Sequence, residues 1–138
     1  MNDIIIKPIG YIKSPFKKVE DIPPQSIYAN EKTAVIELLE EYKEGLKDLE
    51  NFSHIVIQFY FHQSKGYDLH TLTPWSEERK GVFSTRSPRR PNPIGISVVK
   101  LKKIDGCKIE IQGVDMLDKT PIVDIKPYIA KLNPVEEE

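Results

Sequence analysis

The sequence contains a single cysteine, Cys107, among its 138 residues. One thiol forms neither an intrachain disulfide nor a zinc site built on several cysteines. Its flanks, Gly106 and Lys108, indicate a turn that holds a small, unreactive side chain. No apolar run approaches the length that crosses a bilayer, and the N-terminus lacks a charged segment followed by an apolar one. We therefore expect a soluble, cytoplasmic protein with no membrane segment.

Neither sign of charge dominates the chain. Twenty Lys and Arg residues face 21 Asp and Glu residues, which gives a formal net charge of −1. A nucleic-acid partner would have to be attracted by a local patch, because no global basic field exists. Hydrophobic residues make up 39% and charged residues 30%, which is typical of a folded domain with a real core. We expect residues 1–138 to form one domain.

Several catalytic and nucleotide-binding signatures are missing. Neither Gly-x-Gly-x-x-Gly after a strand nor Gly-x-x-x-x-Gly-Lys-Ser/Thr occurs, which argues against a doubly wound nucleotide fold. There is no His-Glu-x-x-His, and His54, His62 and His70 lack carboxylate partners at ligand spacing, so we expect no metal site. Asp115 and Asp118 could do acid–base work, although aspartates in such a connector more often cap turns.

Strand patterns and turns occupy most of the chain. The clearest strand covers residues 52–62, where Ile55, Ile57 and Phe59 alternate with a mixed face. Residues 17–30 and 63–80 read as long loops, and Trp75 in the second could stack on a base or anchor the loop. The pattern predicts a mainly β fold, a small closed antiparallel β-barrel with one short helix and long functional loops. Strands are expected over 4–12, 33–39, 52–62, 81–85, 94–102, 108–114 and 122–125, a helix over 40–51, and a hairpin at Asp105-Gly106.

The most distinctive stretch, which we call the arginine loop, covers residues 81–97 and reads GVFSTRSPRRPNPIGIS. All four arginines of the chain lie in it or just before it: Arg79, Arg86, Arg89 and Arg90. Its three prolines fix their own φ and push the preceding residues toward extended conformations, which predicts a stiff loop. Guanidinium groups match carboxylate and phosphate geometry. The loop is therefore either a ligand or nucleic-acid site, or a rigid connector whose arginines face water.

Residues 81–95 of the arginine loop resemble the signature of the TsaA-like, or TrmO, family of β-barrel tRNA methyltransferases. The resemblance implies a small barrel that binds S-adenosylmethionine and works as a homodimer. It also implies methylation of the exocyclic N6 of threonylcarbamoyladenosine at tRNA position 37. Many relatives carry an additional C-terminal domain, and compared with them we expect residues 1–138 to form the single TsaA-like barrel domain with no extra C-terminal domain. Four further segments agree in order and spacing: IGYIKSPF at 9–16, IPPQ at 22–25, FSHI at 52–55 with FHQ at 61–63, and LDKTPIVDIKPY at 117–128.

The resemblance also implies roles for particular residues. Asp118 and Asp115 are candidates to accept the proton of the acceptor nitrogen, and Arg89 and Arg90 are expected to grip tRNA phosphates. Lys119 departs from the family, which usually has Gly there, and Pro24 stands where Arg is usual. The methyl donor is expected to contact Ser26, Ile27, Tyr28, His62, Gln63, Arg86, Leu117, Asp118, Lys119 and Thr120.

Two other functions stay open at this point. One is a non-catalytic RNA-binding barrel that keeps the arginine loop. The other is a methyltransferase that acts on another nucleoside or on a small molecule, since a fold does not fix a substrate.

Overall fold

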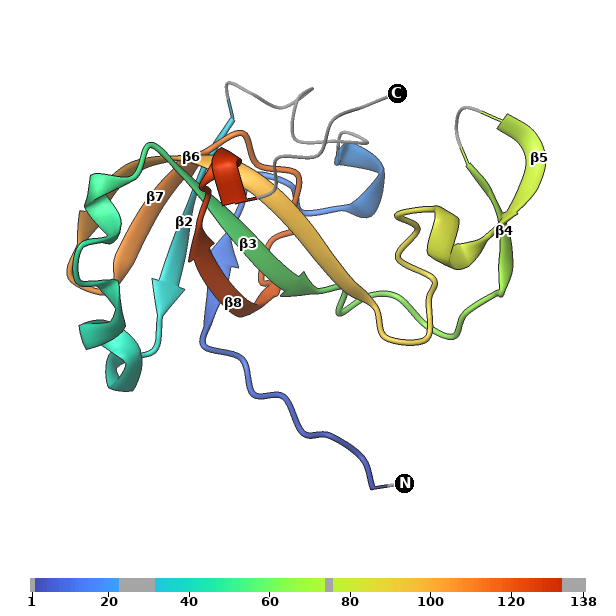
Figure 1. Ribbon diagram of the computed structural model, residues 1–138, viewed down its shortest axis with the longest axis horizontal. Helices are drawn as coiled ribbons and strands as arrows, with labels where there is room; N and C mark the ends of the chain where they lie inside the picture. Colours follow the sequence, from blue (N-terminus) through green and yellow to red (C-terminus); the bar gives the residue numbers. More distant parts are fainter. Residues whose placement is uncertain (1, 23–31, 74–75, 133–138) are drawn as a thin grey trace.

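The computed structural model describes residues 2–22, 32–73 and 76–132, and its centre is a closed barrel (Figure 1). Within these residues six strands form the barrel in the order β1-β2-β7-β6-β3-β8, and all neighbouring pairs are antiparallel. The predicted mainly β class and closed antiparallel barrel are confirmed. The barrel strands are β1 (Gly10–Lys13), β2 (Thr33–Leu38), β3 (His54–Tyr60), β6 (Ile94–Asp105), β7 (Lys108–Gln112) and β8 (Pro121–Pro127).

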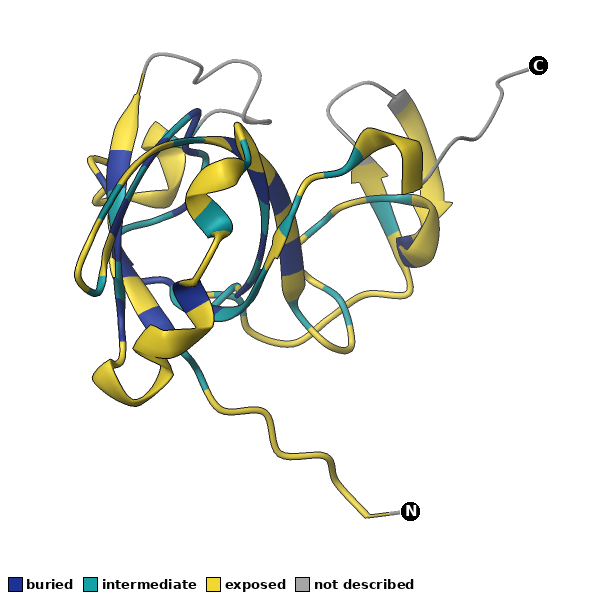
Figure 2. Ribbon diagram, turned by 60° about the vertical axis from the view of Figure 1, so that its left-hand side comes forward, coloured by how far each residue is buried: buried dark blue, intermediate teal, exposed yellow. Residues whose placement is uncertain are grey.

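Strict alternation along the strands builds the core. Ile55 and Ile57 of β3 are fully buried and Phe59 is 4% exposed, as their spacing predicts. Ile109 and Ile111 of β7 point inward in the same way. Figure 2 shows buried positions recurring along the strands of the ring, while the outlying segments are exposed. Within the described ranges no helix is long and apolar enough to cross a membrane.

The first strand is shorter than predicted. β1 begins at Gly10, and Ile4 and Ile5 are 85% and 84% exposed. Ile9, directly before β1, is hydrogen-bonded to the barrel. Its N–H donates to the Ile122 carbonyl, and its own carbonyl accepts from the Leu39 N–H. A run of β-branched residues favours extended backbone, but a strand also needs a partner edge. Residues 2–8 have none among the described residues.

The predicted helix over residues 40–51 consists of two 3-10 helices, η3 (Glu40–Leu46) and η4 (Leu49–Asn51). Asp48 separates them in a left-handed conformation with φ 70°, which interrupts a continuous helical hydrogen-bond pattern. Leu46 and Leu49 still pack against the core, as the predicted helical face requires. Two shorter 3-10 helices, η1 (Val19–Asp21) and η6 (Ala130–Leu132), lie elsewhere.

The expected loop over residues 63–80 contains a hairpin. β4 (His70–Thr73) pairs with β5 (Ser76–Gly81) as a separate two-stranded sheet beside the barrel (Figure 1). The strand predicted over 81–85 is wrong, because residues 82–84 form the 3-10 helix η5 (Val82–Ser84). Val82 is 1% exposed and its N–H donates to the Leu69 carbonyl, so burial fixes the turn there. Trp75 lies outside the described residues.

The β6–β7 hairpin turns where the Asp-Gly signal predicted it. Gly106, at φ 62°, is the first of the two turn residues, a position that favours glycine. β6 is longer than expected, and its second half alone pairs with β7, from Lys100↔Gln112 to Asp105↔Lys108. Among the described strands, residues 94–99 of β6 pair with β3 only. One edge of β6 is therefore without a neighbouring strand at its start.

Gly95→Ala should destabilise the fold by about 1–3 kcal/mol, since an added methyl overpacks a filled core. A Cβ at Gly95 would lie 2.5 Å from the Phe59 ring and 2.8 Å from the Phe61 ring. Those rings already pack edge to face with centroids 5.1 Å apart. Denaturant unfolding measures the change. Gly45→Ala, which meets no atom within 4 Å, is the matched control and should leave the midpoint nearly unchanged. An unshifted midpoint in Gly95→Ala would contradict this packing.

Candidate functional site

A cavity of about 840 Å³ lies where β6 lacks a second partner strand. One wall is the start of β6, with Gly95 and Ser97, and the neighbouring rings of Phe59 and Phe61. The facing wall is the connector after β7, which includes Asp115. The arginine loop closes one side. The remaining lining residues are Val19, Ile22, Gln63, Ser64, Lys65, Thr85, Arg86, Pro88, Arg89, Arg90, Ile94, Ile96, Val98, Met116, Leu117 and Thr120.

The arginine loop is held in shape by its own hydrogen bonds. Thr85 donates its hydroxyl to the Val82 carbonyl at 2.8 Å and accepts from the Ser87 N–H at 3.3 Å. Arg90 donates through Nη1 to the carbonyls of Thr85 and Ser87 at 2.9 and 3.1 Å. Charge-assisted bonds of this kind are stronger than neutral ones. The guanidinium of Arg90 thus stabilises the backbone conformation of the arginine loop.

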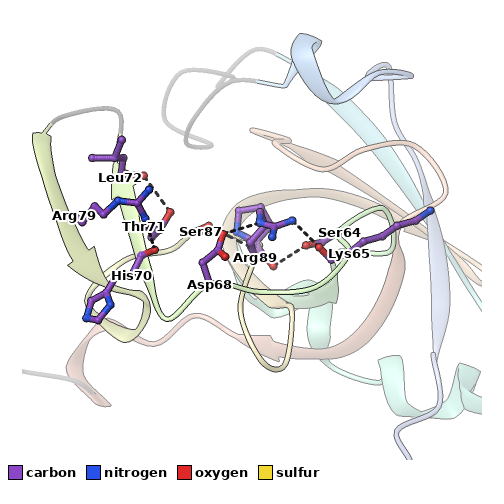
Figure 3. Close-up of polar contacts among 10 residues, drawn as sticks. Ser64, Lys65, Asp68, His70, Thr71, Leu72, Arg79, Ser87 and Arg89 are labelled. Carbon is purple, nitrogen blue, oxygen red and sulfur yellow. Dashed lines mark hydrogen bonds and ion pairs between the residues drawn. The ribbon is translucent and has the colours of Figure 1, made fainter.

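Arg89 ties the arginine loop to the segment after β3. Its Nη1 donates to the Lys65 carbonyl at 2.7 Å, and its Nε lies 3.3 Å from Asp68 Oδ2. Ser64 adds a bond from its hydroxyl to the Pro88 carbonyl at 3.0 Å. Figure 3 shows Arg89 between Asp68 on one side and Lys65 with Ser64 on the other. The two long connections therefore form one wall of the cavity.

Arg86 differs from the other arginines of the loop. Its side chain lines the cavity and is exposed, and among the described residues it has no hydrogen bond or ion pair. A guanidinium in this state presents its donors to whatever enters the cavity. Arg79 lies on β5 and donates only weakly, to the His70 carbonyl at 3.3 Å. The predicted anion-binding role thus fits Arg86 best.

Asp115 and Ser97 both line the cavity and are joined by a hydrogen bond. Ser97, 4% exposed on β6, donates its hydroxyl to Asp115 Oδ1 at 2.5 Å. This bond joins the open edge of β6 to the connector that replaces a strand there. It also fixes a carboxylate at the wall of the cavity. This contact of Ser97 was not predictable from the sequence, because a serine on the inner face of a strand resembles a weak core position.

Asp118 holds two turns together and does not line the cavity. Its Oδ1 accepts from the Ser14 N–H at 2.9 Å, and its Oδ2 pairs with Lys17 at 2.9 Å. Partial burial raises the pKa of Asp118, but the Ser14 N–H, the Lys17 ammonium and the charge of Lys119 together place it below its usual value. A carboxylate with a lowered pKa is a weaker base. Its predicted catalytic role stays a prediction.

The turn that carries Asp118 also supplies cavity residues. Thr120 is 2% exposed, and its hydroxyl donates to the Leu117 carbonyl at 2.6 Å. Leu117 and Thr120 line the cavity, as expected of donor-binding residues. Lys119, between them, is exposed and has a left-handed backbone with φ 69°. A glycine would adopt this conformation without steric cost.

The other predicted site residues are distributed as follows. Gln63 lines the cavity. His62, the residue before Gln63, is half-buried and is not among the residues that line the cavity. Burial lowers the pKa of His62 and so favours the neutral ring. Ser26, Ile27 and Tyr28, together with Pro24, lie outside the described residues. Within the described part of the chain no three His, Cys, Asp or Glu side chains gather as a metal site.

A second cavity, of about 530 Å³, lies near the other end of β3. Phe52, which precedes β3, lines it, whereas Phe59 and Phe61 at the far end of β3 line the first cavity. Leu46 and Leu49 of the 3-10 helices form its apolar floor. It contains none of the residues predicted for the site. Cys107, near η3, donates to Glu40 at 3.0 Å, and this bond raises the pKa of the thiol.

Fold and site together define a small closed β-barrel with an arginine-walled ligand cavity at the open edge of β6. A family model described as the tRNA-methyltransferase O N-terminal domain matches residues 11–133. The chain therefore belongs to the tRNA-methyltransferase O, or TrmO, family, which confirms the resemblance.

Three comparisons place it within that family. A probable S-adenosyl-L-methionine-binding protein of Pyrococcus abyssi is 47% identical over 94% of this chain and 71% of its own length. A mouse tRNA (adenine(37)-N6)-methyltransferase is 39% identical, and the match covers 93% of this chain but 31% of the mouse protein. The crystal structure of TrmO from Pseudomonas aeruginosa superposes with a TM-score of 0.84 at 37% identity, over 99% of this chain and 61% of that one.

Asp118→Asn should remove an acid-sensitive part of the stability. Because the pKa of Asp118 is lowered in the folded state, its contribution is complete above the unfolded pKa and is lost as the pH falls through the folded pKa. At neutral pH the substitution should cost about 1.5–3 kcal/mol, the value of hydrogen bonds to a charged group. Urea unfolding at several pH values measures both effects.

The control for this prediction is Asp105→Asn, at the exposed β6–β7 turn. It should leave stability nearly unchanged at every pH. Equal losses in the two variants, or an unaltered acid limb in Asp118→Asn, would show that Asp118 does not clamp the Ser14 turn.

Proposed function

We propose that this chain is an S-adenosylmethionine-dependent tRNA methyltransferase that methylates the exocyclic N6 of threonylcarbamoyladenosine at position 37. The observation that carries the proposal is the cavity beside β6. It is lined both by the guanidinium of Arg86, which has no hydrogen bond or ion pair among the described residues, and by the carboxylate of Asp115, which Ser97 holds in place. The mouse relative, whose name includes this tRNA position and atom, supports the acceptor. The Pyrococcus relative, named as a probable S-adenosyl-L-methionine-binding protein, supports the donor.

The residues that line the cavity fit such a donor. Its volume of about 840 Å³ falls within the range of about 300–1,000 Å³ usual for small-ligand sites. Phe59, Phe61 and Ile96 offer apolar surface, and Gln63 and Thr120 bring polar groups to the lining. The cation of Arg86 suits a carboxylate, on either the methionine part of the donor or the threonyl group of the acceptor. Residues 26–28, which lie outside the described residues, are expected from the family resemblance to contribute as well.

The chain's task is to position reactants and move one proton. When bound, S-adenosylmethionine supplies a methyl group on a sulfonium, so the protein needs no nucleophile. The walls of the cavity would align that methyl with the acceptor nitrogen and exclude water, which lowers the barrier by several kcal/mol. We assign the nitrogen's proton to Asp115, because it lines the cavity and Ser97 holds it in place.

The tRNA would lie against the arginine loop. Arg89 is half-exposed although it bonds to Lys65 and Asp68, so it can contact a phosphate while it braces the wall. Arg90 is less exposed, and its guanidinium donates hydrogen bonds to the backbone of the arginine loop. The family resemblance further implies a homodimer in the cytoplasm, and both belong to this proposal.

Neutralising Arg86 and Arg89 should have different consequences. Arg86→Gln should weaken binding of S-adenosylhomocysteine about 10- to 100-fold and abolish turnover, since a charge-assisted hydrogen bond contributes about 1.5–3 kcal/mol. Arg89→Gln should chiefly weaken tRNA binding and make it less salt-dependent. Calorimetry with S-adenosylhomocysteine and filter binding of tRNA separate the two.

The control is Arg79→Gln, on the exposed strand β5. It should alter neither affinity by more than about twofold, because the only hydrogen bond of Arg79 among the described residues, to the His70 carbonyl, is long. If Arg86→Gln and Arg89→Gln lost affinity for S-adenosylhomocysteine equally, the division of labour between the two arginines would be refuted.

The reaction itself is tested with methyl-labelled S-adenosylmethionine and tRNA from a strain that lacks this modification. Nucleoside mass spectrometry should find the label on N6-methylated threonylcarbamoyladenosine. Label on another nucleoside would replace the acceptor and keep the enzyme class. Absence of both methylation and calorimetric heat with the donor would leave a non-catalytic RNA-binding barrel.

A further inference from the structure

Residues 2–8, which we call the arm, extend away from the barrel (Figure 1 and Figure 2). Ile4, Ile5 and Ile6 follow one another in the arm and are 85%, 84% and 54% exposed. A continuous run of β-branched apolar residues is typical of a strand that is buried on both faces. The described part of the chain leaves this run in water. The arm thus has the composition of a buried segment without the burial.

Strand β8 has an edge, beside the root of the arm, that no described strand occupies. β1 and β8 are paired only at Gly10↔Ile122 and Tyr11↔Pro121, and beyond Ile122 β8 pairs with β3 alone. The antiparallel register would bring the residues before Gly10 alongside the rest of β8. Pro8 interrupts this continuation, because proline fixes its own φ and has no N–H to donate. An unpaired strand edge is a template for another chain.

The second cavity, of about 530 Å³, lies along this edge. Its lining includes Asp124, Ile125 and Pro127 of β8, together with Ile9 at the root of the arm. Its volume falls in the range of about 300–1,000 Å³ usual for small-ligand sites, so it has room for more than one side chain. Most of the remaining lining is apolar or aromatic: Leu38, Tyr42, Leu46, Leu49 and Phe52.

The charges at the second cavity disfavour a nucleic acid as its occupant. Glu41 and Asp48 bring two carboxylates to the lining, and Asp124 adds a third, which is paired with a lysine of the same strand. Lys47 is the only lysine or arginine of the lining. Phosphates would therefore be repelled. The arm, in contrast, brings apolar side chains and the ammonium of Lys7, which is complementary to this acidic surface.

We propose that the second cavity binds the arm of a second copy of this chain, so that two copies exchange arms across a two-fold axis. Because Ile9 is both the root of the arm and part of the cavity lining, an axis beside Ile9 places each arm next to the other copy's cavity. An extended segment of seven residues reaches about 23 Å, which is ample for such a crossing. Each copy then contributes one arm and one cavity, as an isologous interface requires.

This interface lies outside what the family comparison covers. The family model matches residues 11–133, and the arm precedes them. The inference gives the homodimer of the proposed function a specific surface. It does not depend on methyl transfer, because the exposed isoleucines and the apolar cavity belong to the chain itself.

Ile5→Asp tests the proposal by light scattering coupled to size-exclusion chromatography, with the full chain and without donor or tRNA. We expect the natural chain to be a dimer and Ile5→Asp to weaken it about 100-fold, since each of two arms loses a buried side chain worth roughly tenfold. Ile5→Val should dimerise like the natural chain. The control, Leu72→Asp, replaces an exposed leucine of the separate β4–β5 sheet and should leave the dimer intact. Circular dichroism should show an unchanged barrel, because Ile5 does not pack on it.

A disulfide identifies which copy supplies the arm. In a Cys107→Ser background, which removes the natural thiol, a chain with Ile5→Cys is mixed with a chain with Lys47→Cys, at the lining of the second cavity. We expect mild oxidation to join the two chains, which mass spectrometry detects. Lys80→Cys, on β5 and not part of that lining, replaces Lys47→Cys as the matched control and should cross-link little. A chain that carries both Ile5→Cys and Lys47→Cys should form covalent dimers.

Three results would overturn the proposal. A natural chain that stays monomeric at high concentration would leave the arm without a second copy. An Ile5→Asp dimer as stable as that of the natural chain would place the interface elsewhere. A disulfide formed only within the doubly substituted chain would show that the arm closes over its own cavity. Failure of the proposed function is distinguishable, because none of these measurements uses the methyl donor or tRNA.

Discussion

The architecture depends on a mismatch in length between two neighbouring strands. β6 runs for 12 residues and β7 for 5, so the start of β6 has a partner on one side only. A closed sheet normally satisfies every edge, and an unpaired edge must be covered or used. Here the connector after β7 is not paired as a strand with the start of β6 among the described residues, and the Ser97–Asp115 hydrogen bond links the two. The space between them is the cavity, which lies within the barrel domain itself.

The walls of that cavity are assembled from segments far apart in sequence. Arg89 joins the arginine loop to residues 65–68, and Asp118 joins the turn at Ser14 to the connector after β7. In both cases a charged side chain is used to hold backbone in place. Arg86 is the exception, since its guanidinium lines the cavity and has no hydrogen bond or ion pair within the described part of the chain. Among the described residues, the cluster of four arginines therefore contains one guanidinium without a hydrogen bond or ion pair and three that bond to the backbone of the chain.

Much of the fold could be predicted from the sequence, because alternation reports burial directly. The inward residues of β3 and β7 and the Gly106 turn lie where the pattern predicted them. The errors have physical causes. Residues 4–8 have strand composition but no partner edge among the described residues. β5 has no hydrophobic period, since its residues are exposed on both faces where they are described and its sequence is polar. Val82 was read as strand, although burial and a hydrogen bond to Leu69 make it a 3-10 turn.

The candidate site could be predicted less completely. Arg86, Gln63, Leu117 and Thr120 came from motifs and line the cavity, as does Asp115. Ser97 was missed, because a hydroxyl that bonds across a cavity leaves no periodic signal. Nor could composition tell which arginines are occupied by the backbone, since that depends on how two distant connections meet. The left-handed backbone at Lys119 was not predicted either, because a residue's φ is set by the bonds around it.

The most direct measurement of the central claim is a backbone NMR titration with S-adenosylhomocysteine. The two cavities lie near opposite ends of β3, so the amides that shift identify the occupied one. We expect the largest changes at Gly95, Ser97, Asp115 and Arg86. Changes centred on Leu46 and Ile125, at the second cavity, or no changes at all, would contradict the assignment of the open edge of β6 as the donor site.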